Sequence, residues 1–238
     1  MKSATPKQFL PLLNRQVLDY SLDLFLNDVG TTAGVCLVID PSQRSRYSAR
    51  YPKFLKSGAL TFASPGKERQ DSVLSGLTSL SSTNAAAAYA AVHDSARPLV
   101  TPAEVLAVVA DAKEHGAAVL AVPCKGTIKR AAEGQFVEET PDRAMLYEAQ
   151  TPQVALISLL LEGFEHVDRT GAAVTDDVSV IEALGLPVKI TVGEYENIKI
   201  TTPGDLKVAE GVLVERRGGL WKRLGRRVRR VFGGGKVA

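Results

Sequence analysis

Apolar residues follow two alternating patterns along the first 215 positions of the chain. Continuous apolar runs occupy 33–40 (AGVCLVID) and 117–123 (AAVLAVP), and a third run precedes His93. Such runs are typical of parallel strands that are covered on both faces. Helical spacing predicts helices at 16–26, about 68–80, 102–115, 153–168 and 176–184. Strands that alternate with helices in this way predict an α/β fold, doubly wound around a mostly parallel, Rossmann-like sheet.

Capping residues mark two of the predicted helix starts. Thr101-Pro102-Ala103-Glu104 combines an N-cap threonine, a proline at the first helical position and a glutamate two residues later. Thr202-Pro203-Gly204-Asp205 opens the last helix in the same way. Just before it, ENIKITTP (196–203) predicts a short strand that contains Lys199. A lysine in a half-buried strand favours an anion as its partner, whereas an edge strand would leave it in solvent.

The segment 126–143 interrupts the alternation of strands and helices. Two short stretches of alternating residues flank Glu133-Gly134, which predicts a β-hairpin. Both stretches are polar, so neither has a face that the main sheet would cover. We therefore expect the hairpin to leave the sheet as an arm.

Composition and charge divide the chain at residue 215. The 238 residues are 45% hydrophobic, which is ample for one core, and no apolar run is long enough to span a membrane. Residues 216–238 hold nine Lys and Arg and no acid, whereas 1–215 hold 20 basic and 26 acidic residues, a net charge of −6. We assign 1–215 to one domain and 216–238 to a basic tail.

The basic tail has apolar residues at helical spacing, namely Leu220, Leu224, Val228 and Val231. This pattern predicts a short amphipathic helix that could contact anionic lipid or nucleic acid weakly. A disordered tail with no role is the alternative.

Polar residues that directly follow an apolar strand are the best candidates for chemistry, because ligands of open α/β sheets bind beyond the carboxyl ends of the strands. His93-Asp94-Ser95-Ala96-Arg97 follows such a strand. An aspartate there can hold Mg²⁺, and an arginine beside it can bind a phosphate in a bidentate manner. The alternative is a capping aspartate with a solvated arginine.

Three further segments place polar residues at predicted helix starts. PGKERQDSV (65–73) delivers the chain to a helix, where Ser72 and backbone amides could bind an anion or the polar edge of a base, or simply cap the helix. AQTPQV (149–154) and VTDDVS (174–179) each place a threonine before a helix start, which taken alone indicates a cap.

Taken together, the segments PKQFLPL, PGKERQDSV, VHDSARPLVTP, TIKR, QTPQ, TDDVS and YENIKITTPGDL resemble the 2-C-methyl-D-erythritol 4-phosphate cytidylyltransferase family. The resemblance runs from about Lys2 to Glu215. It implies a Rossmann-like nucleotidyltransferase domain whose β-arm interlocks two subunits of a homodimer. It also implies a reaction that joins CTP to methylerythritol 4-phosphate and releases pyrophosphate, with Mg²⁺ as cofactor.

The resemblance implies a role for each matching position. Lys7 and Lys199 match the catalytic lysines on the phosphates, and Asp94 matches the residue near Mg²⁺ and the ribose or substrate. The cytosine and ribose pocket is matched by Gly66, Lys67 and Ser72. The remaining substrate contacts are matched by Ser95, Arg97, Thr127, Arg143, Thr151 and Thr175. Of these, Thr127 and Arg143 lie on the arm and reach the partner subunit's site, whereas His93 is expected to be a packed neighbour of Asp94.

The start of the chain departs from the family pattern. The family begins with a strand and a loop of the type G-G-x-G-x-R-M-G, and Met1 falls at the methionine of that loop. We expect the chain as written to lack this segment, to fold poorly and to have impaired activity.

Two other functions remain open at this point. A sibling enzyme would cytidylylate a pentitol phosphate, and a non-catalytic paralogue would use the basic tail for binding. The residues of the motifs HDSARPL and GKERQDSV resemble those of the plastid members of the family. This resemblance favours the plastid stroma over a bacterial cytoplasm as the location.

Overall fold

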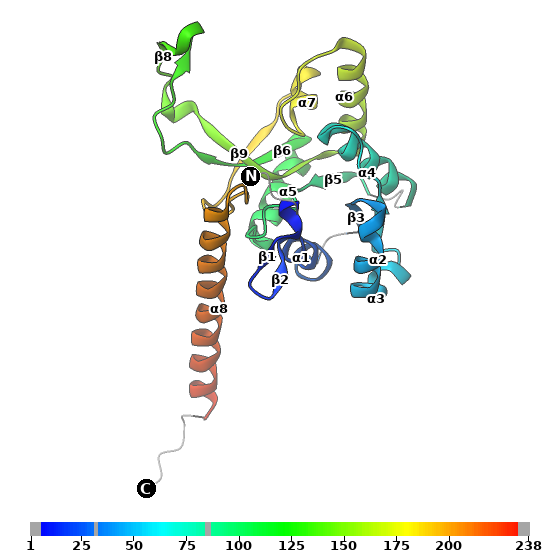
Figure 1. Cartoon of the computed structure of the whole chain (residues 1–238), viewed down its shortest axis with the longest axis vertical. Coiled ribbons are helices and arrows are strands. Elements are labelled where there is room, and N and C mark those ends of the chain that lie inside the picture. The colour runs from blue at the N-terminus through cyan, green and yellow to red at the C-terminus, as the bar shows by residue number, and fades with distance from the viewer. Residues whose placement is uncertain (1–5, 31–32, 84–86, 233–238) are drawn as a thin grey trace.

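The computed structural model of the chain describes residues 6–30, 33–83 and 87–232, and the burial of residue 134 and of residues 219–232 lies outside this description (Figure 1). A four-stranded sheet forms its centre, with β5 (Tyr89–Val92), β6 (Ala117–Pro123), β9 (Tyr147–Leu156) and β10 (Lys189–Val192) in the order β10-β6-β9-β5. A parallel pair, β3 (Val35–Val38) and β4 (Leu60–Ala63), forms a separate two-stranded ladder.

Three strands of the central sheet share one direction. β6 pairs with β10 in parallel, and both β5 and β6 pair with β9 antiparallel. The sheet is therefore mixed, because β9 runs against both of its neighbours.

Helices cover both faces of the sheet, which makes the fold doubly wound. Ala117 of β6 packs on one face against α6 (Ile157–Thr170) and α7 (Ser179–Ala183), together with α4 (Arg69–Thr83). Ala118, the next residue of β6, packs on the other face against α5 (Pro102–His115). This alternation follows from the pleat of the strand, which points successive side chains to opposite faces.

The remaining elements lie around this sheet and its helices. They are η1 (Lys7–Phe9), β1 (Pro11–Leu12), β2 (Arg15–Gln16), α1 (Val17–Asp23), η2 (Leu24–Asp28), α2 (Pro41–Arg50), α3 (Pro52–Lys56), β7 (Arg130–Ala131), η3 (Glu133–Gln135), β8 (Val137–Glu139), η4 (Arg143–Met145) and α8 (Pro203–Phe232). In the part of the chain that is described, no helix is long and apolar enough to cross a membrane.

One predicted helix boundary and one predicted strand are wrong. The helix expected over 153–168 begins only at Ile157, because Val154 and Ala155 are buried in β9 and pair with both β5 and β6. The strand expected around Lys199 is a loop, in which Ile200 donates a single backbone hydrogen bond to the Ala96 carbonyl (2.8 Å). In both places tertiary pairing, rather than local pattern, decides the structure.

The capping boxes predicted at Thr101 and Thr202 and the predicted hairpin are confirmed. The Thr101 hydroxyl accepts from the Glu104 N–H (3.3 Å), and the Glu104 carboxylate accepts from the Thr101 N–H (2.8 Å). β7 and β8 form an antiparallel hairpin around η3, and Figure 1 shows β8 standing clear of the sheet. The caps predicted at Thr151 and Thr175 are wrong, because Thr151 lies inside β9 and neither α6 nor α7 has a side-chain cap.

The basic tail predicted for 216–238 begins within α8, which continues to Phe232. Its side chains from 219 onward, and all of 233–238, lie outside the described residues, as do 1–5 at the start. The contact expected between this tail and an anionic surface stays a prediction.

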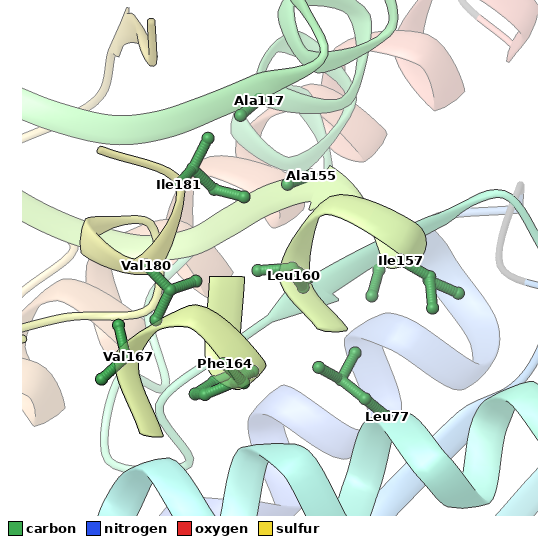
Figure 2. Packing of buried hydrophobic residues seen from close by; sticks show 10 residues of the cluster. Leu77, Ala117, Ala155, Ile157, Leu160, Phe164, Val167, Val180 and Ile181 are labelled. Atoms are coloured by element: carbon green, nitrogen blue, oxygen red, sulfur yellow. The ribbon is translucent and has the colours of Figure 1, made fainter. Parts of the chain in front are cut away.

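Helices α6 and α7 approach each other closely in the main core (Figure 2). Leu160 and Phe164 of α6 pack with Val180 and Ile181 of α7. A Cβ added at Gly163 of α6 would lie 2.7 Å from the Val180 carbonyl oxygen. Only a glycine allows this contact without moving the backbone.

Substitution of Gly163 by alanine should therefore destabilise the chain by about 1–3 kcal/mol, because the two helices must separate. Gly211→Ala in α8 is the matched control, since a Cβ there would meet nothing within 4 Å. In an exposed helix interior that change should stabilise by about 0.5–1 kcal/mol. Urea unfolding of the three proteins measures both effects, and equal stabilities for Gly163→Ala and the parent would contradict the tight α6–α7 contact.

Candidate functional site

Four charged side chains from distant parts of the chain meet where strand β5 ends. Lys199 Nζ lies 2.7 Å from one carboxylate oxygen of Asp94, and Arg69 Nη2 lies 3.1 Å from the other. Arg69 also binds both oxygens of Asp177, at 2.5 and 2.6 Å. Asp94 and Lys199, both of which the sequence marks as site residues, are therefore in contact, and Arg69 and Asp177 join them.

The Asp94 carboxylate is held in its ionised form. Burial would raise the pKa of Asp94, but the hydrogen bond and the charge of Lys199, followed by those of Arg69, lower it below its ordinary value. Each of its two oxygens thus faces a cation. At neutral pH this position presents a fixed negative charge between two positive ones.

Asp177 is the more deeply buried carboxylate, with its side chain 2% exposed. Burial raises the pKa of Asp177, and the bidentate hydrogen bonds from Arg69 offset this effect only in part. The backbone N–H groups of Asp177 and Val178 both donate to Gln153 Oε1, at 2.8 and 3.0 Å. Because Gln153 belongs to β9, the central sheet holds Asp177 in place.

The loop that carries Lys199 is anchored through Asn197, which is fully buried. Its amide donates to Gln150 Oε1 (3.1 Å) and to the Thr151 carbonyl (3.0 Å), both on β9. The Asn197 carbonyl in turn accepts from Arg97 Nη1 at 2.6 Å. These contacts place Lys199 without any regular secondary structure around it.

Arg97 is mainly engaged with backbone carbonyls. Besides Asn197 it donates to the Ala149 carbonyl (3.3 Å), and its Nε lies 3.9 Å from Asp94. Burial lowers the pKa of Arg97, which the charge of Asp94 opposes. Arg97 therefore adds positive charge to the cluster from a position that is fixed by strand β9 and by the Asn197 loop.

A chain of hydrogen bonds fixes the loop from His93 to Arg97. The Asp94 N–H donates to the Thr151 hydroxyl (3.0 Å), which lies 3.0 Å from His93 Nδ1. His93 Nε2 lies 3.1 Å from the Arg97 carbonyl, an acceptor only, so Nε2 carries the proton and Nδ1 accepts from Thr151. Thr151 is buried, and its hydroxyl positions Asp94 from within the protein.

The turn before α4 is closed by its own side chains. The Gly66 N–H donates to the Ser72 hydroxyl (3.0 Å), and that hydroxyl donates to the Glu68 carbonyl (3.1 Å). A Cβ at Gly66 would lie 2.1 Å from Asp71 Cβ, so this turn requires glycine. Lys67, at its tip, is exposed. The turn stands beside the charged cluster because Arg69 follows directly.

The structure does not bring every predicted residue to this cluster. Lys7 begins η1 and takes part in no ion pair among the described residues. Thr127 and Arg143 belong to the arm, where Arg143 Nη1 donates to the Lys125 carbonyl (3.0 Å). Thr175 is exposed just before Asp177, and Ser95 follows Asp94 in the same loop.

Arg69 and Asp177 were missed as site residues by sequence reasoning. Both occur inside quoted motifs, PGKERQDSV and TDDVS, but a charged residue at a helix start indicates a cap or a solvated side chain when taken alone. Only the spatial meeting of α4 with the 174–178 loop identifies them.

A metal ion at this site would share its ligands with a substrate. In the described part of the chain, no group of three or more His, Cys, Asp or Glu converges as a metal site. Mg²⁺ commonly binds through one or two carboxylates together with phosphate oxygens and water. The carboxylate of Asp94 fits this mode of binding, in which phosphate oxygens and water supply the remaining ligands. It does not fit a site built from protein ligands alone.

Comparison with known proteins identifies close relatives. The family model for IspD, 2-C-methyl-D-erythritol 4-phosphate cytidylyltransferase, matches residues 1–215. A rice protein described as the chloroplastic form of that enzyme is 46% identical over 91% of this chain and 71% of its own length. A Geobacillus kaustophilus protein described as the same enzyme is 40% identical over 91% of this chain and 92% of its own.

Solved structures show the same architecture. The 4-diphosphocytidyl-2C-methyl-D-erythritol synthase of Anaerococcus prevotii superposes with a TM-score of 0.79 at 27% identity, covering 87% of this chain and 92% of that one. The 2-C-methyl-D-erythritol 4-phosphate cytidylyltransferase of Thermus thermophilus gives a TM-score of 0.70 at 32% identity, covering 87% and 93%.

The neutral state of His93 leads to a pH-dependent stability. Burial lowers the pKa of His93 from 6.5 to about 4. Between these values the unfolded chain binds the proton first, so stability is complete above pH 6.5 and falls as the pH drops toward 4. Urea unfolding at pH 7 and pH 5 should show a loss on the order of 1–2 kcal/mol that His93→Gln lacks. The same pH dependence in both proteins would contradict a neutral, buried His93.

Proposed function

Because the chain belongs to the 2-C-methyl-D-erythritol 4-phosphate cytidylyltransferase family, we infer that it transfers the cytidylyl group of CTP to 2-C-methyl-D-erythritol 4-phosphate. It is a nucleotidyltransferase that serves the synthesis of isoprenoid precursors. The observation that carries this function is the convergence of Lys199, Arg69 and Arg97 on Asp94, next to the amide-rich turn at Gly66.

The reaction requires placement and charge neutralisation rather than strong acid–base catalysis. A phosphate oxygen of the acceptor forms a bond to the α-phosphorus of CTP, while the bond from that phosphorus to the bridging oxygen of the β-phosphate breaks. Pyrophosphate leaves with the electron pair. Negative charge is concentrated on the transferred group, so fixed cations around it lower the barrier.

We propose that Lys199 neutralises the α-phosphate, and that Lys7, which lies outside the charged cluster, contacts the phosphates from η1. Lys199 Nζ is 2.7 Å from Asp94 and its side chain is 45% exposed, so it can reach a ligand while it keeps its carboxylate partner. Arg97 adds a positive charge behind it. Ser95 lies in the Asp94 loop and Thr175 beside Asp177, where both would contact the acceptor.

The turn at 65–72 would bind the cytosine and ribose. Gly66, Lys67 and Ser72 lie there at the start of α4, where backbone N–H groups and the helix dipole favour polar and anionic groups. Thr151, whose hydroxyl is bound to Asp94 and His93, would act on the substrate through the position of the Asp94 loop.

We propose Mg²⁺ as the cofactor. Asp94 would hold it together with phosphate oxygens of the nucleotide, and the ion would neutralise charge on the triphosphate. His93 keeps the Asp94 loop rigid for this purpose, since its neutral ring accepts from Thr151 and donates to the Arg97 carbonyl.

We propose a homodimer in which the arm reaches the partner subunit. Phe136, Val137 and Met145 on and beside the hairpin are 76%, 61% and 78% exposed, which leaves an apolar surface without an intramolecular cover. Thr127 and Arg143 on the same arm would then contact the acceptor phosphate in the neighbouring site.

Two alternatives and the location remain to be decided by experiment. A pentitol phosphate would replace the acceptor without changing the nucleotide side of the site, and a non-catalytic paralogue would bind CTP without turnover. For location we propose the plastid stroma, supported by the chloroplastic description of the rice relative, with bacterial cytoplasm as the alternative since the Geobacillus relative is bacterial. Cell fractionation distinguishes the two.

Release of pyrophosphate from CTP tests the function directly. With methylerythritol 4-phosphate and Mg²⁺ the protein should turn over, and faster than with a pentitol phosphate. Lys199→Met should lower kcat by about 10²–10³, because a preorganised charge at the transferred group is lost. Lys207→Met, an exposed lysine of α8, is the matched control and should leave kcat unchanged. If the protein binds CTP but releases no pyrophosphate with either acceptor, the non-catalytic alternative is favoured. Full activity of Lys199→Met would contradict the assignment of the charged cluster as the active site.

Sedimentation of the purified protein tests the arm. Met145→Glu should weaken self-association at least ~10-fold, because a charge would enter an apolar contact between subunits. Val208→Glu on α8 is the control, since Val208 is also exposed (55%) but lies outside the arm. A parent protein that is strictly monomeric at micromolar concentration would rule out the dimer and the role of Arg143 in a neighbouring site.

A further inference from the structure

Arg69 joins the two halves of the site. We propose that it is a positioning residue that couples the nucleotide turn at 65–72 to the Asp94–Lys199 pair, with Asp177 as its anchor. This role rests on the proposed function and adds a residue to it. The role follows from the geometry of the Arg69 guanidinium group, the burial of Asp177 and the place of Arg69 at the start of α4.

Both terminal nitrogens of the Arg69 guanidinium group bind carboxylates. Arg69 Nη1 binds Asp177 Oδ1 at 2.5 Å, and Nη2 binds both Asp177 Oδ2 at 2.6 Å and Asp94 Oδ1 at 3.1 Å. A planar fork can hold two carboxylates in a fixed relation, whereas the single ammonium of a lysine cannot. Arg69 is therefore placed to orient Asp94, and its terminal nitrogens are already occupied when a phosphate arrives.

The Asp177 carboxylate, which anchors the Arg69 guanidinium group, is held by the central sheet. The Asp177 side chain is 2% exposed, and the backbone on either side of it is bound to Gln153 of β9. Gln153 is itself 3% exposed. Among the described residues, Arg69 is the cation that the structure pairs with Asp177. A bidentate ion pair to a buried group on the central sheet gives Arg69 a fixed position.

The same residue begins α4 and so fixes the turn before it. Arg69 is the first residue of α4, and the turn is closed by bonds from Gly66 to Ser72 and from Glu68 to Asp71. A shift of Arg69 would therefore move the turn that is proposed to bind the nucleotide. It would also release one oxygen of Asp94, whose other oxygen holds Lys199.

A shift of the turn and the release of Asp94 would each change the distance between the bound CTP and the groups that react with it, namely the acceptor phosphate and Lys199. Misplacement of reacting groups by about 1 Å can cost about 10² in rate. A residue that only neutralised Asp177 would affect stability but not this distance. The two roles are therefore separable by experiment.

Four variants of the full chain separate these roles: Arg69→Gln, Arg69→Lys, Asp177→Asn and the double variant Arg69→Gln/Asp177→Asn. Arg46→Gln on α2 is the control, because Arg46 is an exposed arginine away from the site. For each protein one measures the melting temperature, kcat and KM with methylerythritol 4-phosphate, and the Kd of CTP by calorimetry.

We expect Arg69→Gln to lower both the melting temperature and kcat, the latter about 10²-fold, and to weaken CTP binding about 10-fold. The double variant should recover the melting temperature, because Asp177 is no longer an unpaired charge, but should keep the losses in kcat and CTP affinity. Arg69→Lys should lose less of kcat than Arg69→Gln, since one contact survives. Arg46→Gln should match the parent.

Recovery of kcat together with melting temperature in the double variant would overturn the proposal, as would a kcat within twofold of the parent in Arg69→Gln. If the parent binds CTP but turns over neither acceptor, the proposed function fails and the coupling is judged by the CTP affinities alone. If the parent neither binds nor turns over CTP, both are overturned.

Discussion

Two carboxylates that are largely removed from water, those of Asp94 and Asp177, set the conditions for the rest of the site. A buried negative charge is stable only when cations and hydrogen-bond donors surround it. Arg69 and Lys199 supply these charges from segments 130 residues apart in the sequence. The need to pair these charges therefore brings together the start of α4, the end of β5 and the loop before α8.

The sheet makes this pairing possible because strand β9 forms hydrogen bonds to the loops that contain Asn197, Asp94 and Asp177. Gln150, Thr151 and Gln153 are consecutive or nearly so on β9, and each is buried. They bind the Asn197 loop, the Asp94 loop and the Asp177 loop respectively. One antiparallel strand thus carries the hydrogen bonds that hold three irregular loops, and this gives precise placement to a site that has little regular structure of its own.

Features that depend on neighbouring residues in the chain could be predicted from the sequence, whereas features that depend on contacts between distant segments could not. The strands at 33–40 and 117–123 and the capping box at Thr101 depend on local pattern, and they were predicted. β9 was taken for the start of a helix because Val154 and Ala155 are apolar in either structure, and only their pairing with β5 and β6 decides. Asp94 was predicted to follow one strand and Lys199 to lie in another, and the second strand is a loop. The Arg69–Asp177 pair joins residues 108 positions apart and leaves no local pattern.

The charge balance of the cluster explains how cations can converge before a phosphate is bound. The domain as a whole is acidic, with a net charge of −6 over residues 1–215, yet three cations lie within 4 Å of Asp94. Without a carboxylate between them these cations would repel one another and the loops would separate. With Asp94 and Asp177 present the five groups sum to a single positive charge, which attracts an anion. An incoming phosphate then meets Lys199, whose side chain is 45% exposed and whose ammonium has three N–H donors, so that it can bind the phosphate and Asp94 together while Arg69 stays bound to Asp177.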